Sequence, residues 1–321
     1  MRDSGTGERV PIDGQSGVRL GATVWIDEDA SIGVQLGGFL LSRVSSGSAF
    51  RSDSNGNPSL AQPIIDANTG IQFPLFISDP AIGPLTGTYA NASTSRLFGW
   101  EVNGVFDTAM SSGPLKVRGL VGFRQIGLRE SYSESVTIQN PQGTPFALTF
   151  GGTTSLGLST LDSFRADTDF YGVQVGTRVG YHFGRVDVDV TGKLAMGVSQ
   201  QRVNISGLTT DVSGAALLGG LRALSSNIGS HTSNDFAVAP EIGLNVSYQV
   251  AKGVSLRAGY NFLYLSRVVR PTNQIDLVTN PGLVPSDPSF GTIGGPSRPH
   301  YDRQAADFWV HGLSAGLTLE F

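Results

Sequence analysis

Nine stretches of the chain alternate between apolar and polar residues. In one of them, Val173 and Val175 share a face, and Gln174 and Gly176 share the opposite face. This period of two is typical of a β-strand whose faces meet different environments. The stretches cover residues 18–26, 32–40, 98–107, 115–124, 171–183, 186–199, 236–250, 254–264 and 309–321. They predict an all-β protein with an antiparallel, up-and-down arrangement of about nine visible strands.

The composition of the two faces favours a membrane barrel over a soluble all-β fold. The polar face is rich in glycine and carries a few charges of both signs, as the crowded interior of a small barrel requires. The apolar face carries aromatic residues near strand ends, where a transmembrane barrel places its interfacial girdles. The predicted girdle residues are Trp25, Phe106, Phe183, Tyr248, Tyr264 and Trp309. We therefore expect a transmembrane β-barrel in the cell outer membrane, in contact with outer-membrane lipid.

The connections between these stretches alternate in length. Short turns are expected near 27–30, 108–113, 184–185 and 251–253, and long polar loops near 43–93, 131–162, 204–233 and 271–305. Outer-membrane barrels join their strands by short periplasmic turns and longer extracellular loops. The pattern therefore predicts which end of the barrel faces the cell exterior.

The number of strands bears on completeness. Single-chain bacterial barrels have an even number of strands, so nine visible strands predict about ten in the full-length protein. We expect residues 1–16 to be an N-terminal loop remnant and residues 17–321 to form one barrel domain. On this hypothesis a signal peptide and one strand lie upstream, since the segment MRDSGTGERVPIDG has no apolar core of a signal peptide.

Composition narrows the functional classes. The 321-residue chain contains no cysteine, which excludes disulfides and thiolate metal sites. Its formal net charge of −4 argues against nucleic acid as a partner. It has no apolar run of about 18 residues, so an ordinary transmembrane helix is not expected. The 43 glycines, about twice the usual share of roughly 7%, suit a crowded lumen.

Nine charged residues are predicted to point into the lumen. Two interpretations are open: a network of ion pairs that fills the interior, which buried charges favour, and a narrow polar channel whose charges tune permeation. Barrels of about eight to ten strands are normally filled by side chains, which favours the first. The residues are Glu101, Arg118, Arg124, Arg178, Asp187, Lys193, Glu241, Arg257 and Glu320.

The C-terminal strand resembles the signal that the outer-membrane assembly machinery reads. The pattern is a polar residue, a glycine, a hydrophobic residue and a terminal aromatic residue at fixed spacing. Ser314, Gly316, Leu319 and Phe321 match it in order. This predicts the assembly machinery as a partner.

Candidates for catalysis are few. Of the four histidines, His231 lies near Ser230, Ser233 and Asp235, and this group is the one candidate for a barrel hydrolase. The histidine spacing does not suggest a metal site, and no cofactor is expected. The segment 267–276 places two arginines at the barrel rim, for pairing with loop carboxylates or, as an alternative, for binding anionic lipopolysaccharide groups.

Several long motifs are similar to the planctomycete outer-membrane family called beta-barrel protein seven. They include FRADTDFYGVQVGTRVGY at 164–181, SNIGSHTSNDFAVAPEIGLNVSYQ at 226–249 and YNFLYLSRVVRPTNQIDLVTNP at 260–281. KLAMGVSQQRVNISG at 193–207, GPSRP at 295–299 and DFWVHGL at 307–313 agree as well, and the first half agrees more loosely. The resemblance implies an outer-membrane location and carries over no catalytic or binding residues.

Together these observations predict a non-enzymatic integral outer-membrane barrel with a polar, charge-paired lumen and long surface loops. We expect a structural or surface-contact role in the envelope. A small porin or channel is the first alternative, and an outer-membrane barrel hydrolase is the second.

Overall fold

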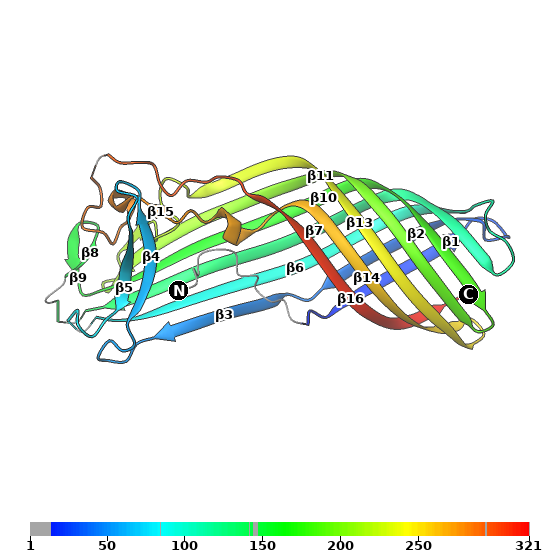
Figure 1. The fold of residues 1–321 in the computed structure, drawn as a ribbon, viewed down its shortest axis with the longest axis horizontal. Coiled ribbons are helices and arrows are strands. Elements are labelled where there is room, and N and C mark those ends of the chain that lie inside the picture. The colour runs from blue at the N-terminus through cyan, green and yellow to red at the C-terminus, as the bar shows by residue number, and fades with distance from the viewer. Residues whose placement is uncertain (1–13, 84, 141, 144–146, 293, 321) are drawn as a thin grey trace.

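One large antiparallel sheet dominates the computed structural model, which describes residues 14–83, 85–140, 142–143, 147–292 and 294–320 (Figure 1). Nine of its strands are hydrogen-bonded in sequence order along a single path. They are β1 (Gly17–Trp25), β2 (Ile32–Leu41), β6 (Thr86–Asp107), β7 (Leu115–Gln139), β10 (Gly157–Phe183), β11 (Val186–Asp211), β13 (Gly229–Ala251), β14 (Val254–Val269) and β16 (Ala305–Leu319). The predicted all-β, antiparallel fold is confirmed.

The expected strand count is wrong, because the regions assigned to loops contain further strands. β3 (Val44–Arg51) pairs with β6, and β12 (Ala216–Leu218) pairs with β11, so the large sheet has eleven strands. A second sheet has the order β15 (Val278–Thr279), β4 (Leu60–Asp66) and β5 (Gln72–Ser78), and β8 (Leu148–Phe150) pairs with β9 (Thr153–Ser155). Two short 3-10 helices, η1 (Pro271–Gln274) and η2 (Pro281–Leu283), lie in the last long connection.

The main strands are also much longer than predicted. β10 has 27 residues and β11 has 26, whereas a strand that crosses a bilayer needs about 9–11. Much of the predicted loops at 131–162 and 204–233 therefore belongs to β7, β10, β11 and β13. These extensions of predicted strands were missed because their apolar residues change face beyond the alternating stretches.

This change of face divides the molecule into two halves. The short-turn half contains the nine alternating stretches and the short turns. The long-loop half contains the other ends of β6, β7, β10, β11 and β13, together with the smaller strands. In Figure 1 the C-terminus lies at the short-turn end, and β4, β5, β8, β9 and β15 lie at the opposite end.

Side-chain exposure along β10 shows the change. In the short-turn half, the apolar Val173 is 63% exposed while its neighbour Gln174 is 1% exposed. In the long-loop half, the apolar Phe164 is fully buried while its neighbour Arg165 is exposed. The apolar face is therefore the outer surface in one half and the interior in the other.

The sheet curls so that its inner face encloses a lumen. Arg19 on β1 reaches Glu241 on β13, although five strands separate them in the sheet order. β1 and β16 are the two edges, and no pairing joins them among the described residues. In a row of nine strands, each antiparallel to the next, the first and the last run in the same direction. One further strand antiparallel to both β1 and β16 would therefore close the sheet. The expected upstream strand stays a prediction.

Local hydrogen bonds fix the first short turn, between β1 and β2. The Asp27 carboxylate accepts hydrogen bonds from the backbone N–H groups of Ser31 and Ile32 and from the Ser31 hydroxyl. The Ser31 hydroxyl contributes most to lowering the pKa of Asp27 to about 2. Asp27 is therefore ionised at neutral pH and holds the turn as an Asx-type cap.

Within the described ranges, no helix has the length and apolarity needed to cross a membrane.

Candidate functional site: two layers across the lumen

A layer of charged side chains crosses the lumen of the short-turn half. Glu241 on β13 pairs with Arg124 on β7 and, at 2.9 Å, with Arg19 on β1. Glu101 on β6 pairs with Lys193 on β11 and lies 3.9 Å from the Nε of Arg124. The layer therefore links four strands, β6, β7, β11 and β13, to the edge strand β1.

The pairing in this layer offsets the cost of burial. The side chains of Glu241 and Arg124 are 5% and 3% exposed, and that of Lys193 is 7% exposed. Buried charges are tolerated when they are paired and hydrogen-bonded, and removal of one partner is costly. Two carboxylates face three cations here, so each carboxylate pairs with two cations and the layer keeps a formal charge of +1.

Two amides extend the layer and were not among the predicted residues. The Nε2 of Gln174 donates to Glu101 at 3.1 Å and to the Oδ1 of Asn103 at 2.5 Å. Gln174, Asn103 and Arg19 all occupy the polar face of an alternating stretch. Alternation alone therefore indicates their direction, and only the register of the strands brings them to the two glutamates.

The other predicted lumen charges lie away from this layer. The Nη2 of Arg178 donates to the Oε1 of Gln35 at 3.3 Å, and the Nε of Arg257 donates to Asn245 at 3.1 Å. Arg118 pairs with Asp107 at 2.9 Å. The partly exposed Asp187 lies 2.6 Å from the Nδ1 of His182, close to a short turn. Glu320 is exposed beyond the end of β16.

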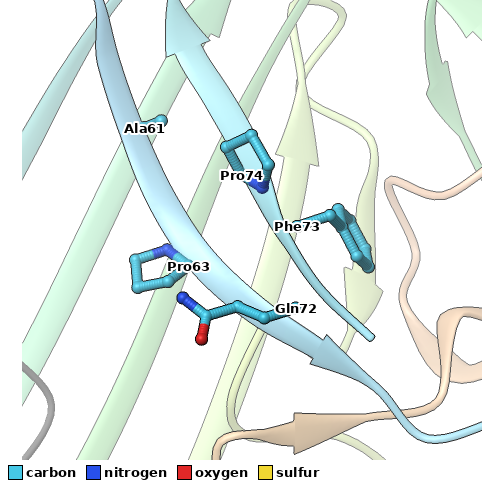
Figure 2. Close-up of a pocket in the computed structure, with 5 residues that line it drawn as sticks. All are labelled: Ala61, Pro63, Gln72, Phe73 and Pro74. Carbon is cyan, nitrogen blue, oxygen red and sulfur yellow. The ribbon is translucent and has the colours of Figure 1, made fainter. Parts of the chain in front are cut away.

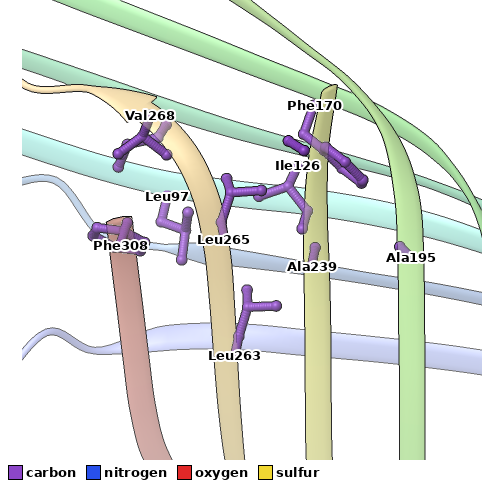
Figure 3. Close-up of a cluster of buried hydrophobic side chains, with 11 residues drawn as sticks. Leu97, Ile126, Phe170, Ala195, Ala239, Leu263, Leu265, Val268 and Phe308 are labelled. Atoms are coloured by element: carbon purple, nitrogen blue, oxygen red, sulfur yellow. The ribbon is translucent and has the colours of Figure 1, made fainter. Parts of the chain in front are cut away.

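An apolar layer lies next to the charged layer, where the two halves meet (Figure 3). Its side chains come from β6, β7, β10, β11, β13, β14 and β16 and are at most 7% exposed. Phe39, Leu41, Ala306 and Val310 pack against it. The layer consists of Leu97, Ile126, Leu128, Phe170, Ala195, Ala237, Ala239, Leu263, Leu265, Val268 and Phe308. Side chains from seven strands thus meet across the interior at this level.

A bulge in β14 completes the apolar layer. The register shifts between Leu265 and Val268, and Arg267 has φ +54°. The carbonyl of Arg267 accepts hydrogen bonds from Ser199 and Gln201, both at 2.7 Å. Such a bulge re-aims the residues that follow it, and here both Leu265 and Val268 are fully buried.

The long-loop half has a folded segment within its lumen. Residues 219–228 lie against β10, where the buried Asp162 accepts hydrogen bonds from the backbone N–H groups of Leu221 and Ala223 at 2.9 and 2.8 Å. Burial raises the pKa of Asp162 to about 6. The side chain of Arg222 donates to the carbonyls of Pro63 at 2.7 Å and Leu277 at 3.3 Å. Hydrogen bonds of this segment therefore connect β10 to β4 and to the start of β15.

Next to this segment, one carboxylate collects three donors. Glu134 on β7 accepts from the hydroxyls of Tyr132 at 2.6 Å and Tyr89 at 3.2 Å, and from the amide of Gln62 at 3.0 Å. Burial, followed by the charge of Glu134, raises the pKa of Tyr132. These bonds hold the β4–β5 hairpin over the wall of the sheet.

The predicted aromatic girdle divides into two groups. Phe106, Phe183, Tyr248 and Trp309 are exposed on the outer surface, and Tyr264 is partly exposed on the same face. Trp25 is placed differently from the prediction: it shares a face with Arg19, and the guanidinium of Arg118 lies 4.6 Å from its ring centroid. The reason is parity, since Trp25 falls on the polar face of its stretch.

The C-terminal candidate residues lie on the edge strand β16. Ser314 pairs with Gly259, Gly316 with Arg257 and Leu319 with Val254, all on β14. Phe321 lies outside the described residues. Their role in assembly stays a prediction.

The structure does not bring the candidate hydrolase residues together. The Nε2 of His231 lies 3.1 Å from the carbonyl oxygen of Asn227, and its ring stacks on Tyr301 at 3.9 Å. Asp235 pairs with Arg303, and the hydroxyl of Ser233 donates to Gln201 at 3.1 Å. Each group therefore has another partner.

The rim arginines differ from each other. Arg270 pairs with Glu130, a buried carboxylate of β7, and its guanidinium lies 5.9 Å from the ring centroid of Phe308. Arg267 is exposed at the bulge. The first arginine therefore pairs with a carboxylate, as the sequence interpretation favoured, although this carboxylate belongs to the wall.

A pocket of roughly 300 Å³ lies on the β4–β5 hairpin (Figure 2). It is lined by Ala61, Pro63, Gln72, Phe73 and Pro74, none of which is ionisable.

In the part of the chain that the structure describes, no group of three or more His, Cys, Asp or Glu side chains is arranged to hold a metal ion.

Comparison with known proteins assigns the family. Residues 5–321 match the model of the family described as "Putative beta barrel porin-7 (BBP7)". The chain belongs to this family. The match spans nearly all of the chain and confirms the resemblance drawn from the sequence motifs. A search of curated proteins finds no match. A β-barrel of porin type agrees with the curled antiparallel sheet, implies an outer-membrane location and suggests a non-enzymatic protein.

Proposed function

We propose that this protein is an integral outer-membrane barrel whose lumen is closed to solutes and whose long-loop half forms a folded contact surface outside the membrane. The observation that carries the proposal is the apolar layer across the lumen. Apolar constrictions resist wetting and oppose the passage of ions. The charged layer beside it pairs its charges across the lumen.

The outer surface supports the membrane part of the proposal. In β10 the exposed apolar residues run from Tyr171 to Phe183, a length that suits one bilayer crossing by a tilted strand. Beyond Tyr171 the outward positions of β10 carry Asp169, Asp167 and Arg165. The short-turn half therefore fits the hydrocarbon region, and the long-loop half fits water.

The first experiment tests membrane insertion. We expect the intact protein to remain with the membrane fraction after high-salt and carbonate washing and to need detergent for release. Recovery in the soluble fraction without detergent would contradict the proposal.

The second experiment measures conductance of the purified protein in planar bilayers. A closed lumen predicts no steady current steps. Steady steps would instead favour the second candidate, a small porin, which the family description supports.

A pair of variants would show whether any such current passes through the lumen. Lys193→Gln removes a positive charge from the charged layer, whereas Arg51→Gln removes one from β3 in the long-loop half. A current through the lumen should change its ion selectivity with the first variant and keep it with the second.

A further inference from the structure

The outer surface of β6, β7, β10 and β11 carries a cluster of charged residues where the exposed apolar residues end. Six outward-facing side chains form it, and we call it the arginine band. It consists of Arg96, Arg129, Arg165, Asp167, Asp169 and Arg202. Strand pairing places Arg96 opposite Arg129, and both Arg129 and Arg202 opposite Asp167. The band is therefore one continuous surface over four neighbouring strands.

The two aspartates hold only some of the arginines. Arg129 donates to both oxygens of Asp169 at 2.7 Å, and Arg165 pairs with Asp167 at 3.0 Å. The exposed guanidiniums of Arg96 and Arg202 have no hydrogen-bond or ion-pair partner among the described residues. Four arginines and two aspartates leave the band with two positive charges in excess.

The arginine band lies next to aromatic side chains at the edge of the exposed apolar surface. The guanidinium of Arg129 lies 5.4 Å from the ring centroid of Phe98, and Phe98 occupies the outward position between Arg96 and Trp100. In a bilayer, aromatic rings of this kind lie at the level of the lipid headgroups. The arginines then lie at the level of the lipid phosphates.

The outward positions at this level on β16 and β13 are not cationic. On β16 the outward residue next to Trp309 is Asp307, and on β13 the outward residue beyond Phe236 is Asn234. At these two positions on β13 and β16, the outward residue next to the exposed apolar residues is therefore not a cation.

From this placement we infer that the arginine band binds the phosphate-bearing headgroup of an anionic membrane lipid. Arg96 and Arg202 supply the free guanidiniums, which match phosphate oxygens bidentately. Asp167 and Asp169 hold the other two arginines in place. This inference rests on the proposed membrane insertion of the short-turn half.

Two tryptophans provide the test, because they lie at matched positions with and without the band. Trp100 is 48% exposed beside the band, and Trp309 is 50% exposed beside Asp307. Two single-tryptophan proteins, W25F/W309F and W25F/W100F, are reconstituted in phosphatidylcholine vesicles. Brominated phosphatidylglycerol or brominated phosphatidylcholine is added, and the quenching of each tryptophan gives the relative association of the two lipids.

We expect phosphatidylglycerol to associate near Trp100 about fivefold more strongly than phosphatidylcholine for each free arginine, with no such preference near Trp309. The preference should fall to nearly one in R96Q/R202Q and persist in the control R51Q, which removes an exposed charge of β3. Folding of every variant is checked by the heat-dependent mobility shift of the barrel. If W25F prevents folding, binding of the two lipids to the wild type and to R96Q/R202Q is compared by native mass spectrometry.

Equal quenching by the two lipids at Trp100, or a preference that survives R96Q/R202Q, would overturn the inference. Quenching of neither tryptophan by either lipid would instead contradict membrane insertion itself, and the lipid site with it. Failure of the site and failure of the proposed function thus give different results.

Discussion

The two halves of this protein are built from the same strands and place opposite chemistry on the same faces. Along β10, outward positions from Tyr171 to Phe183 are apolar except Thr177, and inward positions between them are glycine, Gln174, Arg178 and His182. Past Tyr171, inward positions include Phe170 and Phe164, and outward positions are mostly polar. The backbone continues without interruption, so the difference lies in what surrounds each half.

A single physical rule accounts for both halves. Apolar side chains lie on the face that avoids water. With the proposed membrane insertion, lipid outside and paired charges inside satisfy that rule in the short-turn half, whereas water outside and an apolar core inside satisfy it in the long-loop half. The alternation shows that the two faces differ, and only the kind of polar residue on one face supports the proposal that the other face meets lipid.

The largest expected effect is in the charged layer. Glu241→Ala leaves Arg124 buried without its carboxylate, and such a loss typically costs about 3–5 kcal/mol in the free energy of unfolding. Urea unfolding of the refolded protein in detergent measures it. The control Glu28→Ala removes an exposed carboxylate of the first short turn and should change little. A cost under about 1 kcal/mol for Glu241→Ala would show that the layer is hydrated rather than buried.

A matched pair on β10 compares the outer surfaces directly. Val175 is 49% exposed in the short-turn half, and Leu161 is 46% exposed in the long-loop half. Lysine at a lipid-facing midplane position costs about 2–4 kcal/mol, so Val175→Lys should destabilise the protein in vesicles by that amount. Leu161→Lys should stay within about 0.5 kcal/mol, as at an ordinary surface. Equal costs would remove the distinction between the halves.

The stability of the long-loop half should depend on pH through Asp162. Its pKa in the folded protein, about 6, lies above the ordinary value of 3.8, so the folded state binds the proton more tightly. The stabilisation is complete below about pH 4 and is lost as the pH rises through about 6, a change on the order of 2–3 kcal/mol. Hydrogen exchange of the Leu221 and Ala223 amides, corrected for intrinsic rates, measures the change locally.

Asp162→Asn should remove this dependence while it keeps an oxygen acceptor for the two amides. Exchange protection that is flat with pH in the wild-type protein would show that Asp162 does not titrate in this window.

The smallest expected effect is at Glu134. Tyr132→Phe removes a hydroxyl that donates to this carboxylate at 2.6 Å and should cost about 1.5 kcal/mol. Tyr89→Phe removes the longer bond of 3.2 Å and should cost less. Proteolysis within the β4–β5 hairpin reports the change, because these bonds hold the hairpin over the wall. A larger cost for Tyr89→Phe than for Tyr132→Phe would show that the shorter hydrogen bond is not the more stabilising one.

Sequence reasoning succeeded where one rule held along a whole stretch. The directions of Glu101, Arg124, Lys193 and Glu241 followed from parity, and the placement of Trp25 was wrong only because parity was not applied to it. Continued past Tyr171, the same parity would have placed Phe170 inward. The change from polar to apolar inward residues was instead taken as the end of the strand.

Other features could not be predicted from the sequence, because they depend on contacts between residues far apart along the chain. Arg19 and Glu241 are 222 residues apart, and their contact depends on the curl of the whole sheet. The segment 219–228 has no periodic pattern, because its place in the lumen rests on backbone hydrogen bonds to Asp162 and on contacts from Arg222. Such contacts join distant elements and leave no local signal.

The sequence by itself determined the all-β class, the direction of most side chains in the nine stretches, and the family, since these depend on local alternation and on contiguous motifs. The tertiary structure decided the length of the strands, the joining of the charged side chains into one layer, and the apolar layer across the lumen. The physical reason is that a strand fixes only which way a side chain points. What that side chain meets depends on strands brought near it by the curl of the sheet.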